Sequence, residues 1–316
     1  MELISTFKKQ GGIKLLKQYW ESGSLFTAIF QFLLLGKSRT ALEILRLSAG
    51  LKTKQKLERK YKNKLERFNQ LYQHNHYSHN KSNKVWVCWF QGMDNAPVLV
   101  QKCYKSLKQN LSNYDIILIT EANMLEYVQF PDYILSKWHI GQISNTHMTD
   151  LLRLELLIRY GGLWLDATVL CTSSDLPAYY FNSDLFLYQC LKPGRDGHCS
   201  YVSSWLISAK SNNKLLMATR FLCYEYWKKN KNMVDYFLLH DLMSIVFDYY
   251  PEDWKKIIPV DNATPHILLL RLFDQYDEEV WQAVKEKNPF HKLTYKFENG
   301  QTKLKGTYYD VLLKCL

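Results

Sequence analysis

Residues 146–172 read THMTDLLRLELLIRYGGLWLDATVLCT, and this stretch predicts a helix, a glycine break, a short strand and an acidic turn. Residues 148–159 are too rich in leucine and isoleucine for a helix with one buried face. A helix that is apolar nearly all round is buried inside a domain. Residues 161–162 are both glycine, which ends helices by adopting left-handed backbone angles. Residues 163–165, Leu-Trp-Leu, then predict a buried strand, so the stretch indicates an α/β core.

Three charged side chains are expected to meet inside this apolar stretch. Asp150 and Arg153 lie three residues apart in the predicted helix, so both emerge on one of its faces. Asp166 follows the predicted strand, and α/β proteins bind ligands at the ends of buried strands. Taken one at a time, each residue is better explained as part of a structural ion pair or as a cap. Taken together, they favour a ligand site, because their spacing matches a known signature.

Residues 149–153 and 161–168 resemble a sugar-transferase signature, Ser/Thr-Asp-x-x-Arg followed by Gly-Gly-x-aromatic-x-Asp-x-Asp. The signature marks glycosyltransferases with the GT-A nucleotide-sugar fold, including mannosyltransferase-like families with a DXD motif and the clostridial glucosylating toxins. The chain resembles most closely the bacterial capsular polysaccharide synthesis family of these enzymes, over about residues 84–296. One residue departs from the pattern, because Thr168 stands where the last acid of the DXD motif is expected.

The resemblance implies roles for the residues of the signature. Asp150, Arg153 and Asp166 form the catalytic set: the first two hold hydroxyls of the donor sugar, and Asp166 holds the ribose or metal-bound phosphates. Gly162 belongs to the same nucleotide-sugar-binding segment. Asp166 and Thr168 are the candidate ligands of a divalent metal, Mn²⁺ or Mg²⁺.

The metal dependence has two alternatives. A hydroxyl is a poorer ligand than a carboxylate for a hard divalent cation, so a metal would bind weakly and arrive with the donor diphosphate. Otherwise cations such as Lys292 and Lys296 replace it. The sequence favours the donor-dependent metal, because the diphosphate itself brings much of the required negative charge.

Residues 85–90 and 115–120 predict two strands, and residues 97–110 predict a helix between them. Strand, helix and strand in this order predict a parallel pair with a right-handed crossover. In the resembling families the end of the first strand holds the base and ribose, which assigns Trp89, Gln91 and Gly92 here. For Trp89, stacking on the base and packing in the core are equally good interpretations.

The later part of the chain continues the α/β pattern and ends in a basic segment. Residues 184–188 and 204–208 predict strands, and residues 215–228 and 234–249 predict helices. Residues 291–296, HKLTYK, resemble a basic segment found late in the capsular enzymes. His291, Lys292 and Lys296 could there neutralise the leaving diphosphate, and an exposed basic strand is the alternative interpretation.

The basic charge is concentrated at the N-terminal side of the chain. Residues 1–84 hold 17 Lys and Arg against 5 Asp and Glu, a balance of +12, whereas the rest holds 24 against 25, a balance of −1. This asymmetry predicts a basic helical region over residues 1–83 and a GT-A-like glycosyltransferase domain over residues 84–316. Residues 52–67 predict an exposed charged helix. No nucleic-acid-binding motif accompanies it, so no nucleic-acid partner is expected.

Residues 25–35, LFTAIFQFLLL, predict an apolar helix flanked by cations. Crossing a bilayer takes about 20 residues, so this helix is too short to span one. It is suited instead to peripheral contact with an anionic membrane surface. The alternative is a helix packed on the catalytic domain with its basic face in solvent.

The cellular location is predicted from the cysteines and the first residues. The chain has 7 cysteines with no CxxC pair, which favours reduced thiols. The first residues show no signal-peptide pattern. We therefore expect a cytoplasmic protein, peripheral at the inner face of the plasma membrane through its basic region.

These observations predict a hexosyl-type glycosyltransferase. The donor would be a nucleotide diphosphate sugar, and the acceptor a lipid-linked or polysaccharide intermediate of a capsule or another cell-surface polymer. Family analogy implies retention of the anomeric configuration. The alternative is a non-catalytic, degenerate transferase that acts as a nucleotide-sugar-binding or membrane-associated scaffold. Thr168 is the residue that favours this alternative.

Overall fold

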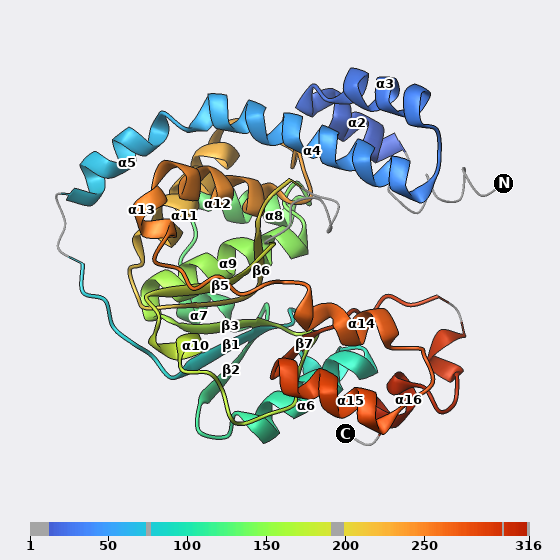
Figure 1. Ribbon diagram of the computed structural model, residues 1–316. Coiled ribbons are helices and arrows are strands. Elements are labelled where there is room, and N and C mark those ends of the chain that lie inside the picture. The colour runs from blue at the N-terminus through green and yellow to red at the C-terminus, as the bar shows by residue number, and fades with distance from the viewer. Residues whose placement is uncertain (1–12, 74–76, 191–198, 299, 315–316) are drawn as a thin grey trace.

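A computed structural model describes residues 13–73, 77–190, 199–298 and 300–314, and Figure 1 shows a mixed α/β arrangement around a central sheet. The five strands lie in the order β2-β1-β3-β6-β5. Their bounds are β1 (Lys84–Cys88), β2 (Asp115–Ile119), β3 (Gly162–Asp166), β5 (Leu185–Gln189) and β6 (Val202–Ala209). Strands β2, β1 and β3 are parallel, and β6 runs antiparallel to both β3 and β5. A second sheet pairs β4 (Val169–Cys171) with β7 (Phe290–Lys292) antiparallel.

Strand β1 is buried on both faces of the sheet. Trp86 and Cys88 belong to one hydrophobic cluster, and Val85 and Val87 belong to another. Successive side chains of a strand point to opposite faces, so this division follows the alternation along β1. Helix α6 (Val98–Asn110) connects β1 to β2. The predicted parallel pair with a helix between its strands is therefore confirmed.

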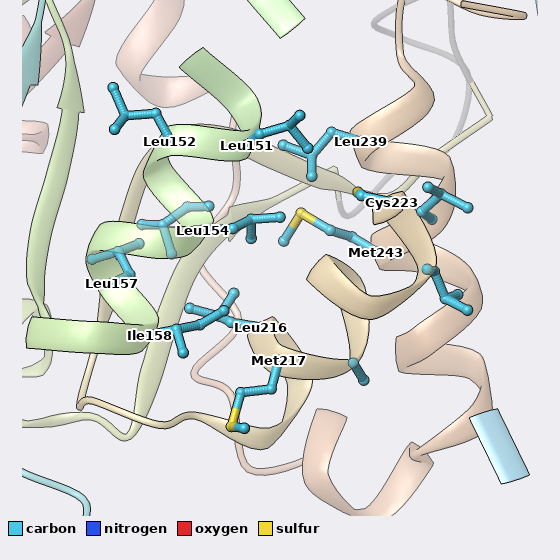
Figure 2. Close-up of a cluster of buried hydrophobic side chains, with 14 of the residues drawn as sticks. Leu151, Leu152, Leu154, Leu157, Ile158, Leu216, Met217, Cys223, Leu239 and Met243 are labelled. Carbon is cyan, nitrogen blue, oxygen red and sulfur yellow. The ribbon is translucent and has the colours of Figure 1, made fainter. Parts of the chain in front are cut away.

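Helix α9 (Asn145–Tyr160) is the central helix of the larger cluster. The Ser144 side chain caps its start by accepting a hydrogen bond from the His147 amide at 3.2 Å, and Gly161 ends it with a φ of 68°. Figure 2 shows its leucines packed against α11 (Lys214–Lys229) and α12 (Leu238–Tyr249). The predicted buried helix is confirmed.

Gly162 allows β3 to approach β1 closely. Its φ is 99°, and a Cβ at this position would lie 2.3 Å from the carbonyl oxygen of Lys84. A larger residue would therefore force β1 and β3 apart. The Trp86 indole also donates to the Gly161 carbonyl at 2.9 Å. The two glycines thus set the position of β3 and of the acid at its end.

The N-terminal helices are α2 (Ile13–Ser22), α3 (Leu25–Leu35), α4 (Arg39–Tyr61) and α5 (Lys64–Gln73). The predicted apolar helix over 25–35 is confirmed. Residues 52–67 were predicted to form an exposed charged helix. Most of their side chains are exposed or half-buried, and the segment is divided between the end of α4 and the start of α5, but Leu57, Tyr61 and Leu65 are buried in the same cluster as α9. These residues recur every four positions and form one apolar face within a charged run. The division between 83 and 84 remains a prediction.

Helix α12 begins later than the sequence indicated. The Asp235 carboxylate accepts a hydrogen bond from the Phe237 amide at 2.7 Å, which holds residues 235–237 in a turn before α12 starts at Leu238. Such local side-chain bonds compete with helix formation.

Shorter elements complete the fold. They are α7 (Met124–Tyr127), α8 (Asp132–His139), α10 (Tyr179–Asn182), α13 (Pro251–Trp254), α14 (Ile267–Arg271), α15 (Glu278–Lys287), α16 (Tyr308–Lys314), and the 3₁₀ turns η1 (Met93–Asn95), η2 (Thr264–His266) and η3 (Gln301–Lys303). Leu268, Trp281 and Leu293 pack against Leu99 of α6 in a third cluster. None of the described helices is both long and apolar enough to cross a membrane. The six cysteines in the described ranges are free thiols, and Cys315 lies outside them.

Candidate active site

A cavity of about 720 Å³ opens where β1 and β3 end. The register places Cys88 beside Asp166, so the residues that follow both strands share one edge of the sheet. The walls come from the end of β1, from α9, from the turn after β3 and from the segment after β7. Its volume lies within the range of small-molecule sites, and its position is the one at which α/β sheets bind ligands.

A second cavity of about 340 Å³ adjoins the first. Its own walls include Asp150 of α9, Ser204 of β6 and His240 of α12. Five residues line both cavities: Thr146, Arg153, Asp166, Tyr236 and Lys292. The charged residues predicted from the sequence therefore lie at the junction of two compartments.

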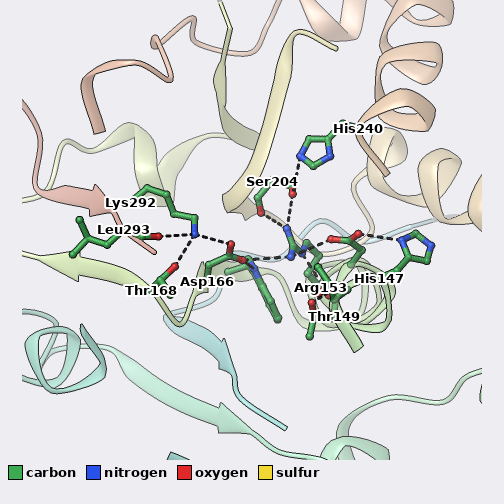
Figure 3. A network of polar contacts seen from close by, with 12 residues as sticks. His147, Thr149, Arg153, Asp166, Thr168, Ser204, His240, Lys292 and Leu293 are labelled. Atoms are coloured by element: carbon green, nitrogen blue, oxygen red, sulfur yellow. Dashed lines mark hydrogen bonds and ion pairs between the residues drawn. The ribbon is translucent and has the colours of Figure 1, made fainter. Parts of the chain in front are cut away.

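Arg153 joins the two acids of this junction, as Figure 3 shows. Its Nη1 donates to the carbonyl oxygen and to the hydroxyl of Ser204, at 2.5 and 2.6 Å. Its Nη2 lies 3.2 Å from Asp150 Oδ1 and 3.3 Å from Asp166 Oδ1. The guanidinium carbon lies 5.0 Å from the centroid of the Trp164 ring. Because its side chain is only 5% exposed, Arg153 is held from all sides and fixes both carboxylates.

Asp150 is a buried anion with two partners. Trp227 Nε1 donates to His147 Nε2 at 3.0 Å, and an indole N–H can only donate. The His147 proton therefore sits on Nδ1, which faces Asp150 Oδ2 at 3.1 Å. Burial acts to raise the pKa of Asp150, but the charge of Arg153 and the His147 hydrogen bond outweigh it, and the pKa is lowered.

Lys292 reaches the site through the second sheet. Strands β4 and β7 pair with Val169 opposite Lys292, and the Leu293 amide donates to the Thr168 carbonyl at 3.0 Å. The Lys292 ammonium donates to Thr168 Oγ1 at 2.6 Å and lies 3.4 Å from Asp166 Oδ2. A lysine 124 residues further along the chain thus contacts both polar residues of the Asp-Ala-Thr sequence.

These residues do not fit a divalent metal in this arrangement. Asp166 Oδ1 accepts from Arg153 and, at 3.1 Å, from Trp164 Nε1, while Oδ2 faces the Lys292 ammonium. The Thr168 hydroxyl is also engaged by Lys292. Mn²⁺ and Mg²⁺ require several oxygen ligands. The described ranges contain no cluster of three His, Cys, Asp or Glu side chains that could hold a metal ion.

Aromatic side chains form the outer wall of the larger cavity. Trp89 and Tyr295 meet edge to face, with ring centroids 5.4 Å apart and planes at 82°. Trp89 Nε1 is buried and has no hydrogen-bond partner within the described ranges. Trp89 therefore both packs in the second hydrophobic cluster and borders the cavity.

The structure brings most of the predicted site residues together. The larger cavity is lined by Trp89, Gln91, Arg153, Asp166, Thr168, Lys292 and Lys296. Asp150 lines the smaller cavity, whereas Gly92, Gly162 and His291 line neither. Gly92 lies after β1 with a φ of 79°, and a Cβ added to it would have no atom within 4 Å.

His291 differs from its neighbour Lys292, although the sequence suggested that both were cations for the diphosphate. His291 is fully buried, and its Nε2 lies 3.1 Å from Thr172 Oγ1. Burial lowers the pKa of His291 to about 4, so the ring is uncharged at neutral pH. From this position it contributes no positive charge to the cavity.

Several lining residues were not predicted from the sequence, and among them Ser204, Tyr236 and His240 border the smaller cavity. His240 Nε2 lies 3.1 Å from Ser204 Oγ, which in turn contacts Arg153. A lone histidine on an apolar helix, as His240 is on α12, is more often packed in a core than part of a site. Its position next to Asp241 in the sequence was the available signal, but the contact depends on how α12 lies over β6.

The sequence pattern of the family described as "Capsular polysaccharide synthesis protein" matches residues 41–312, which is most of the chain. The protein belongs to this family. The matched range begins within α4, so the family includes N-terminal helices as well as the sheet.

Three curated fungal proteins are similar to this family member. "Glycosyltransferase afumC" of Aspergillus fumigatus is 26% identical over 157 residues, 45% of this chain and 38% of that protein. "O-glycosyltransferase PaGT" of Phomopsis amygdali is 26% identical over 51% of this chain and 42% of its own length. "O-glycosyltransferase braB" of Annulohypoxylon truncatum is 32% identical over 92 residues, which are 26% of this chain and 22% of that protein. The chain spans less than half the length of each, and their fungal origin gives no support to a bacterial source.

One solved structure also resembles this family member in outline. "PaToxG Glycosyltransferase" covers 86% of this chain and 97% of its own, at 12% sequence identity and a TM-score of 0.41. Because the TM-score is below 0.5, this likeness bears on neither substrate nor mechanism.

Proposed function

We propose that this protein is a hexosyl-type glycosyltransferase with a GT-A-like fold. It transfers a sugar from a nucleotide diphosphate sugar to a cell-surface polysaccharide intermediate. The observation that carries the proposal is the junction of two cavities at Arg153, Asp166 and Lys292. Family membership and the names of the three fungal relatives support the same class of reaction.

The larger cavity suits the nucleotide. Trp89 and Tyr295 provide aromatic surface for a base, and the exposed Gln91 side chain supplies hydrogen-bonding groups for a base or ribose. Lys292 and Lys296 lie in the same cavity, and a diphosphate carries the complementary charge. A nucleoside diphosphate therefore matches both the apolar and the basic parts of this wall.

The smaller cavity suits the donor sugar and the acceptor hydroxyl. Its polar side chains, among them Asp150, Ser204 and His240, offer acceptors and donors for sugar hydroxyls. Arg153 fixes Asp150 and Asp166, so that two anions face the region where positive charge develops on the sugar ring. Arg153 acts here as a positioning residue.

In this reaction the anomeric carbon exchanges its bond to the diphosphate oxygen for a bond to the acceptor hydroxyl oxygen. The electron pair of the broken bond leaves with the nucleoside diphosphate, and the hydroxyl proton passes to solvent. Negative charge grows on the diphosphate, where a preorganised cation lowers the barrier. Retention of the anomeric configuration, implied by the family resemblance, is part of the proposal, and NMR of the product would test it.

The proposed acceptor is lipid-linked or polymeric, which suits a protein held at a membrane surface. Helix α3 exposes Phe26 by 74%, Leu33 by 75%, Leu34 by 64% and Phe30 by 61%. Residues 1–84 carry a balance of +12, so the exposed apolar side chains lie in a basic region. Apolar side chains among cations are suited to peripheral binding on an anionic bilayer.

The direct test is a binding panel of UDP-, GDP- and ADP-linked sugars, measured by the shift in thermal unfolding. A ligand at about 100 times its Kd stabilises the folded state by about 2.7 kcal/mol. We expect one nucleotide class to raise Tm in the wild type and to raise it much less in Asp166→Asn. A panel without any shift would contradict the proposal.

The non-catalytic alternative makes a different prediction for the same protein. A degenerate transferase would bind the selected donor without releasing nucleoside diphosphate, even when lipid-linked and oligosaccharide acceptors are supplied. Release of nucleoside diphosphate that depends on acceptor would exclude the alternative. The engaged Arg153–Asp166–Lys292 junction favours turnover, because it holds opposite charges where they develop in the reaction.

A further inference from the structure

The Lys292 ammonium lies at the place where the family signature leads one to expect a metal ion. It contacts Thr168 Oγ1 at 2.6 Å, Asp166 Oδ2 at 3.4 Å and the Leu293 carbonyl at 3.3 Å. Figure 3 shows these contacts on one side of Asp166 and Arg153 on the other. The two polar residues of the Asp-Ala-Thr sequence therefore already share a cation that belongs to the chain.

The backbone holds this lysine in place. Lys292 is the last residue of β7, paired with Val169 of β4, and the next amide bonds to the Thr168 carbonyl. Its side chain is 19% exposed, compared with the fully buried His291 before it. Phe290 on the same strand is also fully buried and anchors β7 in the core. The ammonium is thus preorganised, so that binding a ligand costs little side-chain entropy.

A metal at the same place would meet unfavourable electrostatics. A divalent cation close to Asp166 would lie next to two like charges, Arg153 on Oδ1 and Lys292 on Oδ2. It would also lose Thr168 as a ligand, because that hydroxyl accepts from Lys292. The remaining acid of the junction, Asp150, is engaged by Arg153 and His147. The ligands that a hard cation needs are therefore already taken.

We propose that Lys292 replaces the divalent metal as the cation that binds the donor diphosphate. The proposal rests on the glycosyltransferase function proposed above. Lys292 stays against Asp166 and Thr168. Hydrogen bonds to Thr168 Oγ1 and to the Leu293 carbonyl use two of the three ammonium donors, which leaves one donor, beside Asp166, for a phosphate oxygen. Threonine at position 168 then has a physical reason: a neutral hydroxyl accepts from the lysine without adding a second negative charge that would attract a metal.

The competing explanation is that Lys292 only balances Asp166 as a structural ion pair. In that case removing the ammonium would lower stability but leave diphosphate affinity unchanged. Lys296 provides the matched comparison, because it lies four residues later and lines the same cavity. Its ammonium lies 5.9 Å from the centroid of the Tyr295 ring, and the contacts with Asp166 and Thr168 belong to Lys292.

The test measures binding of UDP, GDP and ADP to the full chain by calorimetry, once in excess EDTA and once in Mn²⁺. We expect the wild type to bind one nucleoside diphosphate with a Kd that differs by less than about twofold between the two conditions. Lys292→Met should lose about 10- to 100-fold in affinity in EDTA, the effect of about 1.5–3 kcal/mol for a hydrogen bond to a charged group. Mn²⁺ should restore part of this loss, because Asp166 and Thr168 are then released. Lys296→Met should lose less, with no recovery in Mn²⁺.

Each other outcome counts against the proposal in a distinct way. Binding by the wild type that requires Mn²⁺ would overturn the role of Lys292 and leave the glycosyltransferase function standing. Unchanged affinity in a folded Lys292→Met protein would reduce the contact to a structural ion pair. No binding in either condition would contradict the proposed function and the role of Lys292 together. The wild-type comparison holds even where Lys292→Met fails to fold, and Lys292→Arg, which keeps the charge, should retain binding in EDTA.

Discussion

The junction around Arg153 and the helix α3 depart from the usual distribution of residues in opposite ways. At the junction, charged side chains are buried among apolar ones: Asp150 is 7% exposed and Arg153 is 4% exposed. On α3, large apolar side chains face solvent among cations, and Phe26 and Leu33 are about three-quarters exposed. Proteins usually bury apolar side chains and expose charged ones, so buried charges and exposed apolar patches are the exceptions that point to function.

The two regions differ in whether the chain itself supplies partners for these side chains. Each acid at the junction has partners within the chain: Asp150, which is buried, pairs with Arg153 and His147, and Asp166, which is half-buried, pairs with Arg153 and Lys292. The apolar face of α3 is largely left to solvent by the described residues, with only Ala28 of this helix buried. The charges of the junction are therefore balanced by side chains of the chain itself, whereas the exposed apolar side chains of α3 are the ones that we propose to contact a membrane surface. The following experiments test this difference, from the largest expected effect to the smallest.

The largest effect is expected from Asp166→Asn. The amide keeps the size of the side chain but loses the negative charge between Arg153 and Lys292, so transfer should fall by at least about 100-fold. The measurement is release of nucleoside diphosphate, with thermal unfolding as a check that the protein is folded. Asp175→Asn, at an exposed position beyond β4, is the matched control and should transfer normally. Near-normal turnover in a folded Asp166→Asn protein would remove Asp166 from the site.

Asp150→Ala should lower the free energy of unfolding by about 3–5 kcal/mol, because it leaves His147 and part of Arg153 without their buried anion. A control with the same spacing, but with the arginine first, exists on the surface. Asp274 pairs with Arg271 three residues away at 3.1 Å, with both side chains more than half exposed. Asp274→Ala should cost less than about 1 kcal/mol in denaturant unfolding. Equal costs for the two variants would show that burial does not distinguish the junction.

His291 extends the comparison to a buried group that stays neutral. Its pKa is lowered to about 4, so the unfolded chain binds a proton between pH 6.5 and 4 that the folded protein does not. Stability should therefore fall as pH decreases through this window, by up to about 3 kcal/mol. His291→Gln should show a smaller loss between pH 7 and 4 in urea unfolding. Identical pH profiles for the two proteins would contradict the assignment.

The smallest effect is expected from α3. Replacing Phe26, Phe30, Leu33 and Leu34 with serine should reduce binding to liposomes containing phosphatidylserine by about 10-fold or more, because this apolar surface no longer enters the interface. Transfer to a soluble acceptor should be unchanged. Leu270→Ser is the control, since Leu270 is 80% exposed far along the chain, on α14. Equal binding by the α3 variant and the wild type would argue that α3 serves another purpose.

Local sequence patterns predicted the centre of the fold well. The buried helix α9, the glycine pair and the strand β3 follow from apolar density and backbone preference within a few residues. The ion pair of Asp150 and Arg153 follows from their helical spacing. What could not be predicted depends on contacts between distant segments. The burial of Leu57, Tyr61 and Leu65 is an example. It could not be predicted from a charged segment, because it depends on α11 and α12 lying against α4 and α5.

The segment 290–296 shows most clearly that contacts between distant segments could not be predicted from the sequence. From the sequence, His291 and Lys292 were both predicted to be cations of a basic segment. Pairing of β7 with β4 separates them, because adjacent side chains of a strand point in opposite directions. His291 enters the core against Trp281, with ring centroids 5.4 Å apart, and Lys292 enters the cavity. Which of the two faces the cavity depends on strand register, which apolar alternation does not determine in so short a strand.

The pairing of β4 with β7 also has a consequence for the order of folding. Lys292 and Thr168 are separated by 124 residues, so their contact closes a long loop and costs more chain entropy than the local contacts within α9 and β3. During synthesis, Asp150, Arg153 and Asp166 emerge well before the lysine that completes their charge balance. Until β7 docks, Asp166 has one cationic partner instead of two. The local contacts of α9 and β3 can therefore form while the junction still has one cation, and docking of β7 supplies the second.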